Sequence, residues 1–302
     1  YNMINKMISS VGVGVTSAGG TGTLYIDKTD DNYGLGENIT FNADAEDNIA
    51  LGADALNNTN GVATYNIGIG TYALTDLTDG DKNIAIGVNA GANITAASSN
   101  VCIGHEAADG AITQDGTIAI GSSALGALTS GAKNIAIGYQ AMATHTTGGI
   151  NVAIGYQAMA DTDSGSITLS SHDNVFIGSQ SGGGIWVETS GSAVNYNVAV
   201  GNNAMDAAMD GAASNTAIGH QSLSGLTTAS SNTALGHNSG LLLTTGASNV
   251  AIGFSAAAGI LGGTQNTVMG YNALTTAAST ESDNTAIGYR SMEVMYNVGS
   301  LK

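Results

Sequence analysis

The chain has 302 residues, of which 44 are glycine and none is proline. Only 10% of the residues are charged, and 23 acidic against 6 basic side chains give a net charge of −17. Nucleic acids and anionic membrane surfaces need a basic patch that this composition does not offer, so neither is expected as a partner. No stretch approaches the 18 apolar residues of a membrane-spanning helix, so membrane insertion is not predicted.

Residues 1–47 precede a regular pattern and are expected to form an N-terminal cap or a junction to a preceding domain. Short strands are predicted at residues 23–27 and 38–41, the second resembling a repeat unit that has lost its glycine. A cap is expected because an open strand edge recruits further strands.

One short unit recurs from residue 48 to residue 292. It reads Asn-Ile-Ala-Ile-Gly at 134–138 and Asn-Val-Ala-Ile-Gly at 151–155, and 14 copies are recognisable. Their glycines recur every 17 or 18 residues, apart from two intervals of 23. A fixed period predicts a repeat architecture, and β-branched residues without a helical period predict strands. The expected fold is an all-β, parallel β-solenoid of about 14 coils.

Positions in the unit are counted from its asparagine, position zero, and equivalent positions of successive coils form a column. Position one is Ile, Val or Thr, position two is mostly Ala, position three is a large aliphatic residue and position four is always Gly. Alternate strand residues point to opposite faces. We predict that positions one and three line the inside of the coil. The alanines, such as Ala136 and Ala153, then form an outer face that self-association buries.

The glycine and asparagine columns are expected to be structural. Gly138, Gly155 and their equivalents should end each strand with a backbone angle that a Cβ forbids. Asn134, Asn151 and their equivalents have two interpretations. They can form a ladder of side-chain amides that bond from coil to coil, or they can be turn residues, since asparagine tolerates left-handed backbone angles.

Residues 156–200 contain the two long intervals and are predicted to carry longer loops. Trp186 is the only tryptophan and lies near Glu188. An exposed loop aromatic is suited to contact a sugar or a receptor, whereas the alternative is that it folds back over the widened coil. His172, Asp173 and Tyr196 are candidates to join the same contact surface.

Metal-binding and catalytic residues are sparse. Asp161 and Asp163 begin a segment like a calcium loop, but the later bidentate Glu is missing. His220 and His237 share position five and are weak candidates for a metal pair. A stacked aromatic column is the preferred interpretation, because the next residues at this position are also rings: Phe254, Tyr271 and Tyr289. No metal, cofactor or catalytic set is predicted, and the chain is not expected to be an enzyme.

The unit Asn-x-Ala-Ile-Gly-x-x-Ala resembles the head repeats of trimeric autotransporter adhesins, which are left-handed parallel β-rolls packed as three chains. The copy at 284–289, Asn-Thr-Ala-Ile-Gly-Tyr, with the 17-residue period, more closely resembles repeats of phage tail-fibre proteins. The resemblance covers residues 48–292 and implies an intertwined or side-by-side homotrimer. It also implies that the small residues of positions two and seven lie near the contact between chains. Residues 293–302 are expected to be a tail that leads to another domain.

The resemblance favours a structural segment of a viral fibre, located on the virion surface, that forms a rigid trimeric rod and presents a receptor-binding end. Its expected partners are itself, other fibre or baseplate proteins and a host receptor or glycan. The alternative is an extracellular bacterial adhesin head that binds through the surface of the roll. A glycan-cleaving enzyme would need facing carboxylates, which do not recur. An ice-binding face would need exposed threonines, whereas those at position one are predicted to be buried: Thr216, Thr233, Thr267 and Thr285.

Overall fold

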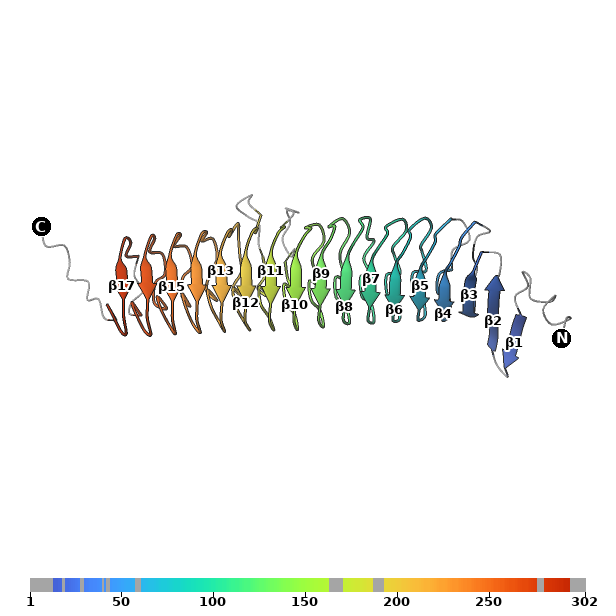
Figure 1. Ribbon diagram of the computed structural model, residues 1–302, viewed down its shortest axis with the longest axis horizontal. Helices are drawn as coiled ribbons and strands as arrows, with labels where there is room; N and C mark the ends of the chain where they lie inside the picture. The colour runs from blue at the N-terminus through green and yellow to red at the C-terminus, as the bar shows by residue number, and fades with distance from the viewer. Residues whose placement is uncertain are drawn as a thin grey trace, which may run out of the picture. The chain divides into compact units, whose positions relative to one another are not determined.

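The computed structural model describes residues 13–17, 20–27, 30–39, 41, 44–57, 61–162, 171–186, 193–275 and 280–293. The chain divides into two compact units, residues 1–149 and 150–302. Every regular element within the described residues is a β-strand (Figure 1). No helix able to cross a membrane occurs in the described part of the chain.

The first unit begins with an antiparallel hairpin and continues as a parallel stack. Strands β1 (Val13–Ser17) and β2 (Gly20–Asp27) form the hairpin, and β2 pairs antiparallel with β3 (Asn32–Gly36). From β3 onward each strand pairs in parallel with the next. The remaining strands are β4 (Ile49–Leu51), β5 (Ile67–Ile69), β6 (Ile84–Ile86), β7 (Val101–Ile103), β8 (Ile118–Ile120) and β9 (Ile135–Ile137).

The second unit is a parallel stack in which equivalent positions face each other, so that Ala217 pairs with Ala234. Its strands are β10 (Val152–Ile154), β11 (Val175–Ile177), β12 (Val198–Val200), β13 (Thr216–Ile218), β14 (Thr233–Leu235), β15 (Val250–Ile252), β16 (Thr267–Met269) and β17 (Thr285–Ile287). Each unit is a parallel β-solenoid of the predicted kind, with one strand per recognised copy and about 14 turns in the chain.

The repeat begins earlier than the sequence analysis placed it. Residues 32–36 read Asn-Tyr-Gly-Leu-Gly and form β3, and Asn48 donates to the Oδ1 of Asn32 from both its backbone N–H and its Nδ2, each at 3.0 Å. The strand expected at 38–41 is wrong, because residues 38, 39 and 41 lie in no strand. The spacing of Asn32 and Gly36 could have revealed this copy. It has tyrosine in place of the β-branched residue at position one and glycine in place of alanine at position two.

The strand faces are the reverse of our prediction. Position two is buried inside the coil, with Ala85, Ala136 and Ala217 all at 0% exposure, whereas positions one and three point outward and are partly or largely exposed. The inside also holds large side chains from position eight, such as Leu125 and Met142. A further buried column follows three or four residues later: Leu77, Ile94, Ile112, Leu128, Met209, Leu226, Leu243 and Ile260.

The narrow coil explains the reversal. Protein interiors are close-packed, and this interior is already filled by the position-eight side chains and the column that follows them. Only a small residue fits on the strand opposite them, so two more aliphatic columns would overpack the core. Position-seven residues such as Ala141 and Ser222 are buried in the same interior. The small residues of positions two and seven therefore do not form the expected outer contact face.

The glycine column ends each strand as predicted. The φ angle at position four lies between 121° and 148° in every copy, a region that only glycine adopts readily. Glycines of neighbouring coils also lie against each other. A Cβ on Gly121 would stand 2.3 Å from the carbonyl oxygen of Gly138, so both backbone angle and close approach exclude a side chain.

Candidate interaction surfaces

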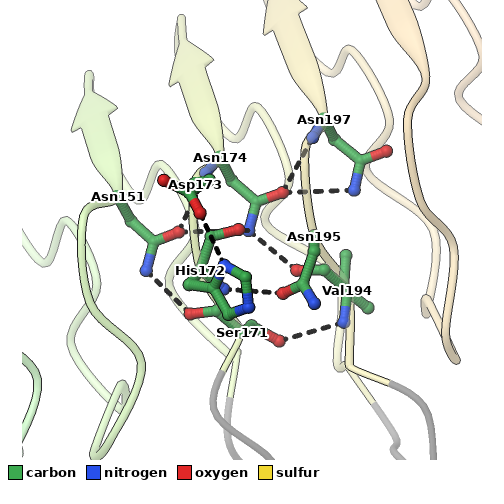
Figure 2. A network of polar contacts seen from close by, with 8 residues as sticks. All are labelled: Asn151, Ser171, His172, Asp173, Asn174, Val194, Asn195 and Asn197. Atoms are coloured by element: carbon green, nitrogen blue, oxygen red, sulfur yellow. Dashed lines mark hydrogen bonds and ion pairs between the residues drawn. The ribbon is translucent and has the colours of Figure 1, made fainter.

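The asparagine column is a buried amide ladder. In Figure 2 the Oδ1 of Asn174 accepts from the backbone N–H of Asn197 at 3.0 Å and from its Nδ2 at 3.2 Å. The Nδ2 of Asn174 in turn donates to the Oδ1 of Asn151 at 3.1 Å and to the backbone oxygen of Val194 at 2.7 Å. Asn134 makes the equivalent bond to the Gly148 oxygen at 2.7 Å. The ladder interpretation is confirmed, because the side chains bond between coils.

Thr117 is the one threonine in this column, and it interrupts the ladder. Its backbone N–H still donates to the Oδ1 of Asn100 at 2.8 Å. Its own Oγ1 is buried and has no hydrogen-bond partner among the described residues. A hydroxyl is too short to repeat the bonds of an asparagine amide, so this coil keeps only part of the network.

Positions one and three form an outward aliphatic face in both units. At position three the exposed fraction is 37% for Ile86, 40% for Ile218 and 46% for Leu235. Because the strands pair in register, such side chains recur at every coil and form continuous apolar columns. Exposed apolar columns of this extent are typical of an interaction surface.

Four threonines replace aliphatic residues at position one of the second unit. Thr216, Thr233, Thr267 and Thr285 point outward, so the predicted inward orientation was wrong. Val250 interrupts their column and large aliphatic side chains occupy the adjacent position three. The outward face is therefore mixed and does not form the flat threonine array that binding to ice would need.

Position five of the second unit carries an exposed aromatic ladder. The rings of His220, His237, Phe254, Tyr271 and Tyr289 stack in that order, with centroids 5.0, 5.0, 5.1 and 5.5 Å apart and interplanar angles of 3° to 14°. We name these five rings the ring ladder. The predicted stacked aromatic column is confirmed, and Phe254 and Tyr271 are 44% and 47% exposed.

Three of the predicted contact residues lie together beside the widened coils. His172 bonds to Asp173 with 2.7 Å between Nδ1 and Oδ2, and it meets the ring of Tyr196 edge to face at a centroid distance of 5.3 Å. Its backbone N–H donates to the Oδ1 of Asn195 at 2.7 Å (Figure 2). The cluster is half-exposed and its polar atoms are largely used within the chain.

Trp186 does not join this cluster. Its side chain is fully buried and packs against Phe176 at a centroid distance of 5.6 Å, and its Nε1 donates to the Gly182 oxygen at 3.1 Å. The expectation of an exposed tryptophan is therefore wrong. The alternative, in which Trp186 folds back onto the widened coil, is confirmed. Phe176 stands where most coils have alanine. Together with Trp186 it fills the wider interior of this coil. Glu188 lies outside the described residues.

The metal candidates gain no support from their arrangement. No group of three or more His, Cys, Asp or Glu side chains within the described residues could hold a metal ion. His220 and His237 stack face to face with their planes 12° apart, as members of the ring ladder. Asp161 accepts the Trp186 backbone N–H at 3.0 Å through its own backbone oxygen, and Asp163 lies outside the described residues.

Burial also determines the chemistry of the only cysteine. Cys102 occupies position two, inside the coil, and burial raises the pKa of its thiol to about 12. A thiol that stays protonated at neutral pH is neither a nucleophile nor a metal ligand. Cys102 is a small buried core residue.

Comparisons of this chain with protein-family models, with curated proteins and with solved structures found no match. The resemblance to fibre and adhesin repeats therefore rests on the repeated motif itself.

Proposed function

We propose that the chain is a structural segment of a homotrimeric fibre, of the kind found in phage tail fibres. In this proposal three copies of the solenoid, each a left-handed β-roll, pack side by side into a rigid rod on the virion surface. Other fibre or baseplate proteins join its ends, and one end presents a site for a host receptor. The protein acts mechanically and as a spacer, without catalysis.

The observation that carries this proposal is the outward aliphatic face. Its columns recur at all 14 coils with the period of the strands themselves, and several of its side chains are more than a third exposed. A partner that covers such a face must offer apolar side chains at the same spacing. A second copy of the chain offers this spacing automatically, and closed symmetric assemblies satisfy identical faces on all subunits.

The free energy of burying apolar surface also favours association through this face. Burying apolar surface contributes roughly 25 cal/mol per Å². A small contribution to the free energy of association from each coil therefore adds up to a large total over many coils. Each coil is narrow, so its interior holds only a few large side chains and buries little apolar area. Association through the aliphatic face supplies burial that the thin core lacks.

The alternative function is a bacterial surface adhesin head. The exposed ring ladder and the cluster around His172 favour it, because both lie on the side of the solenoid and could contact host or matrix molecules. The genes beside the coding sequence distinguish the two functions. Tail genes would indicate a fibre, whereas a gene for a secretion anchor would indicate an adhesin.

Mass in solution tests the trimer directly. Light scattering on the chain should give three times its mass of 29.9 kDa. Ile86→Asp, on the aliphatic face, should reduce the mass, because a carboxylate buried between chains has no partner. Thr95→Asp, an exposed residue of the same coil, is the matched control and should leave the mass unchanged. A stable folded monomer at all concentrations would refute the proposal.

A further inference from the structure

The ring ladder is a rigid surface that the trimer proposal does not use. Its five rings hold one another by stacking at nearly equal intervals, so little side-chain freedom is left to lose on binding. Both faces of the three inner rings are covered by stacking. Four of the five rings carry polar groups: imidazole nitrogens on two of them, and phenol hydroxyls on Tyr271 and Tyr289. The ladder therefore presents an apolar strip with hydrogen-bonding groups along it.

The first four rings of the ladder lie in a stretch of sequence without charged residues, whereas Arg290 follows Tyr289 and lies over its ring, 6.0 Å from the centroid. Residues 211–280 contain no Asp, Glu, Lys or Arg. Position six, directly beyond each of the first four rings, carries uncharged polar residues with left-handed backbone angles: Gln221, Asn238, Ser255 and Asn272. A residue with an amide or hydroxyl side chain thus follows each of these rings in the sequence.

These features select an uncharged occupant. The net charge of −17 disfavours an anionic polymer. A cationic partner would find no acidic group in residues 211–280, whereas acidic side chains are frequent in residues 27–115. Binding sites for small molecules and polymers combine apolar surface with a few placed polar groups, and neutral sugars present apolar C–H faces bordered by hydroxyls. A polymer of sugars can also meet successive rings with successive units.

A second copy of the chain fits the ladder less well. Contacts between in-register copies should repeat at every coil, as the aliphatic columns of positions one and three do. Position five does not repeat in this way. In the first unit it holds Ala53, Thr71, Val88, His105, Ser122 and Tyr139. A feature confined to five coils indicates a local ligand and is not required for assembly along the whole chain.

We propose that the ring ladder binds a neutral polysaccharide along the side of the second unit. This inference rests on the proposed attachment function, and it places glycan contact on the solenoid surface over β13–β17, away from the Trp186 region where the sequence suggested it.

Affinity electrophoresis of the full chain tests the proposal. The gels contain dextran, hydroxyethylcellulose or galactomannan as neutral probes, and alginate as the anionic comparison. The ladder variant is Phe254→Ser with Tyr271→Ser. The matched control is Tyr139→Ser with Tyr156→Ser, which removes two position-five tyrosines that are 48% and 51% exposed and lie outside the ladder. Circular dichroism and light scattering on the same samples report folding and mass.

The expected result is that at least one neutral polymer, but not alginate, retards the chain. The ladder variant should bind about tenfold more weakly, the loss expected when two aromatic contact residues are removed, and the control should bind as before. The proposal is overturned if no neutral polymer retards the chain, or if both variants lose binding equally. It is also overturned if the ladder variant falls to a lower mass, since the rings would then be a contact between chains. A chain that keeps three times its mass without binding sugar refutes this inference alone, whereas a sugar-binding monomer refutes the trimeric fibre alone.

Discussion

The coils of β4–β9 and those of β13–β17 have nearly the same inside and different outsides. Inside, both regions have mostly alanine at position two, the amide ladder, and in several coils a large side chain at position eight, such as Leu74 or Leu223. Outside, position one is Ile or Val in the first region and mostly Thr in the second, and only the second has the ring ladder. Packing between coils restricts the side chains that point inward, whereas the outward columns can differ between the two regions.

The physical reason is that inward side chains contact their equivalents above and below. Changing one of them disturbs three coils, whereas an outward side chain meets solvent or a partner. The largest departure inside the solenoid lies against a position that has no side chain. Phe176 stands in the alanine column, and the position-eight residue of its coil is Gly182, where a Cβ would lie 2.5 Å from the Phe176 ring.

The largest effect is expected at this pair. Phe176→Ala should lower the free energy of unfolding of the second unit by about 3–5 kcal/mol, because it leaves a cavity beside Trp186. The double variant Phe176→Ala with Gly182→Leu recreates the combination of other coils and should recover part of the loss. Denaturant unfolding followed by Trp186 fluorescence measures both. Additive losses in the double variant would show that the two positions are independent.

Replacing a glycine of position four by alanine should lower the stability by similar amounts in the two regions. Gly121→Ala and Gly236→Ala each place a Cβ within 2.4 Å of a neighbouring backbone oxygen at a φ of 134° or 140°, and each should cost roughly 3 kcal/mol from strain and overpacking. Gly288→Ala is the control, since no atom lies within 4 Å of its added Cβ, and it should cost less. Thermal unfolding compares the three variants. A much smaller effect in one region would contradict the common interior.

The amide ladder can be repaired where Thr117 interrupts it. Thr117→Asn should raise the free energy of unfolding of the first unit by about 1 kcal/mol, because it gives a partnered amide in place of a buried hydroxyl without a partner. Asn232→Thr introduces the same interruption into the second unit and should lower stability by a similar amount. Denaturant unfolding measures both changes. A loss of stability in Thr117→Asn would mean that this coil is adapted to the shorter side chain.

The smallest effect is expected in the rate at which a buried thiol is labelled. This rate reports how often each region opens. Burial raises the pKa of Cys102 to about 12, so its thiol should react with a thiol reagent at pH 8 only when the first unit opens. Ala217→Cys in a Cys102→Ala background places the same probe at the equivalent position of the second unit. Both should label at rates far below those of the unfolded chain. Rapid labelling of folded Cys102 would contradict its burial.

Much of the fold could be predicted from the sequence, because the repeat itself encodes it. The spacing of the glycines gave the parallel stack, and the stacked rings followed from column five. The direction of the strand faces could not be read from alternation alone, since small and large residues alternate with the same period. The decisive fact was the width of the coil, which depends on how position eight and the following column fill it.

The candidate surfaces were only partly predictable. His172, Asp173 and Tyr196 were placed together, whereas Trp186 was misplaced because a lone aromatic in an inserted segment gives no sign of its depth. Its partner, Phe176, was visible as an exception in the alanine column, and a large residue there signals a coil that must be filled differently. The early repeat at Asn32 was missed because two of its positions depart from the pattern.

The amide ladder also makes the length of the chain adjustable. Apart from the coil of Thr117, each coil of the ladder presents an asparagine amide to the coils above and below, so coils of equal length present matching hydrogen-bonding groups. Removal of residues 233–249 would join Asn232 to Val250 and leave the sequence Asn-Val-Ala-Ile-Gly, with the strand pairing unchanged on either side. Deletion of one whole repeat should therefore shorten the solenoid by one coil and leave the core of the remaining coils unchanged.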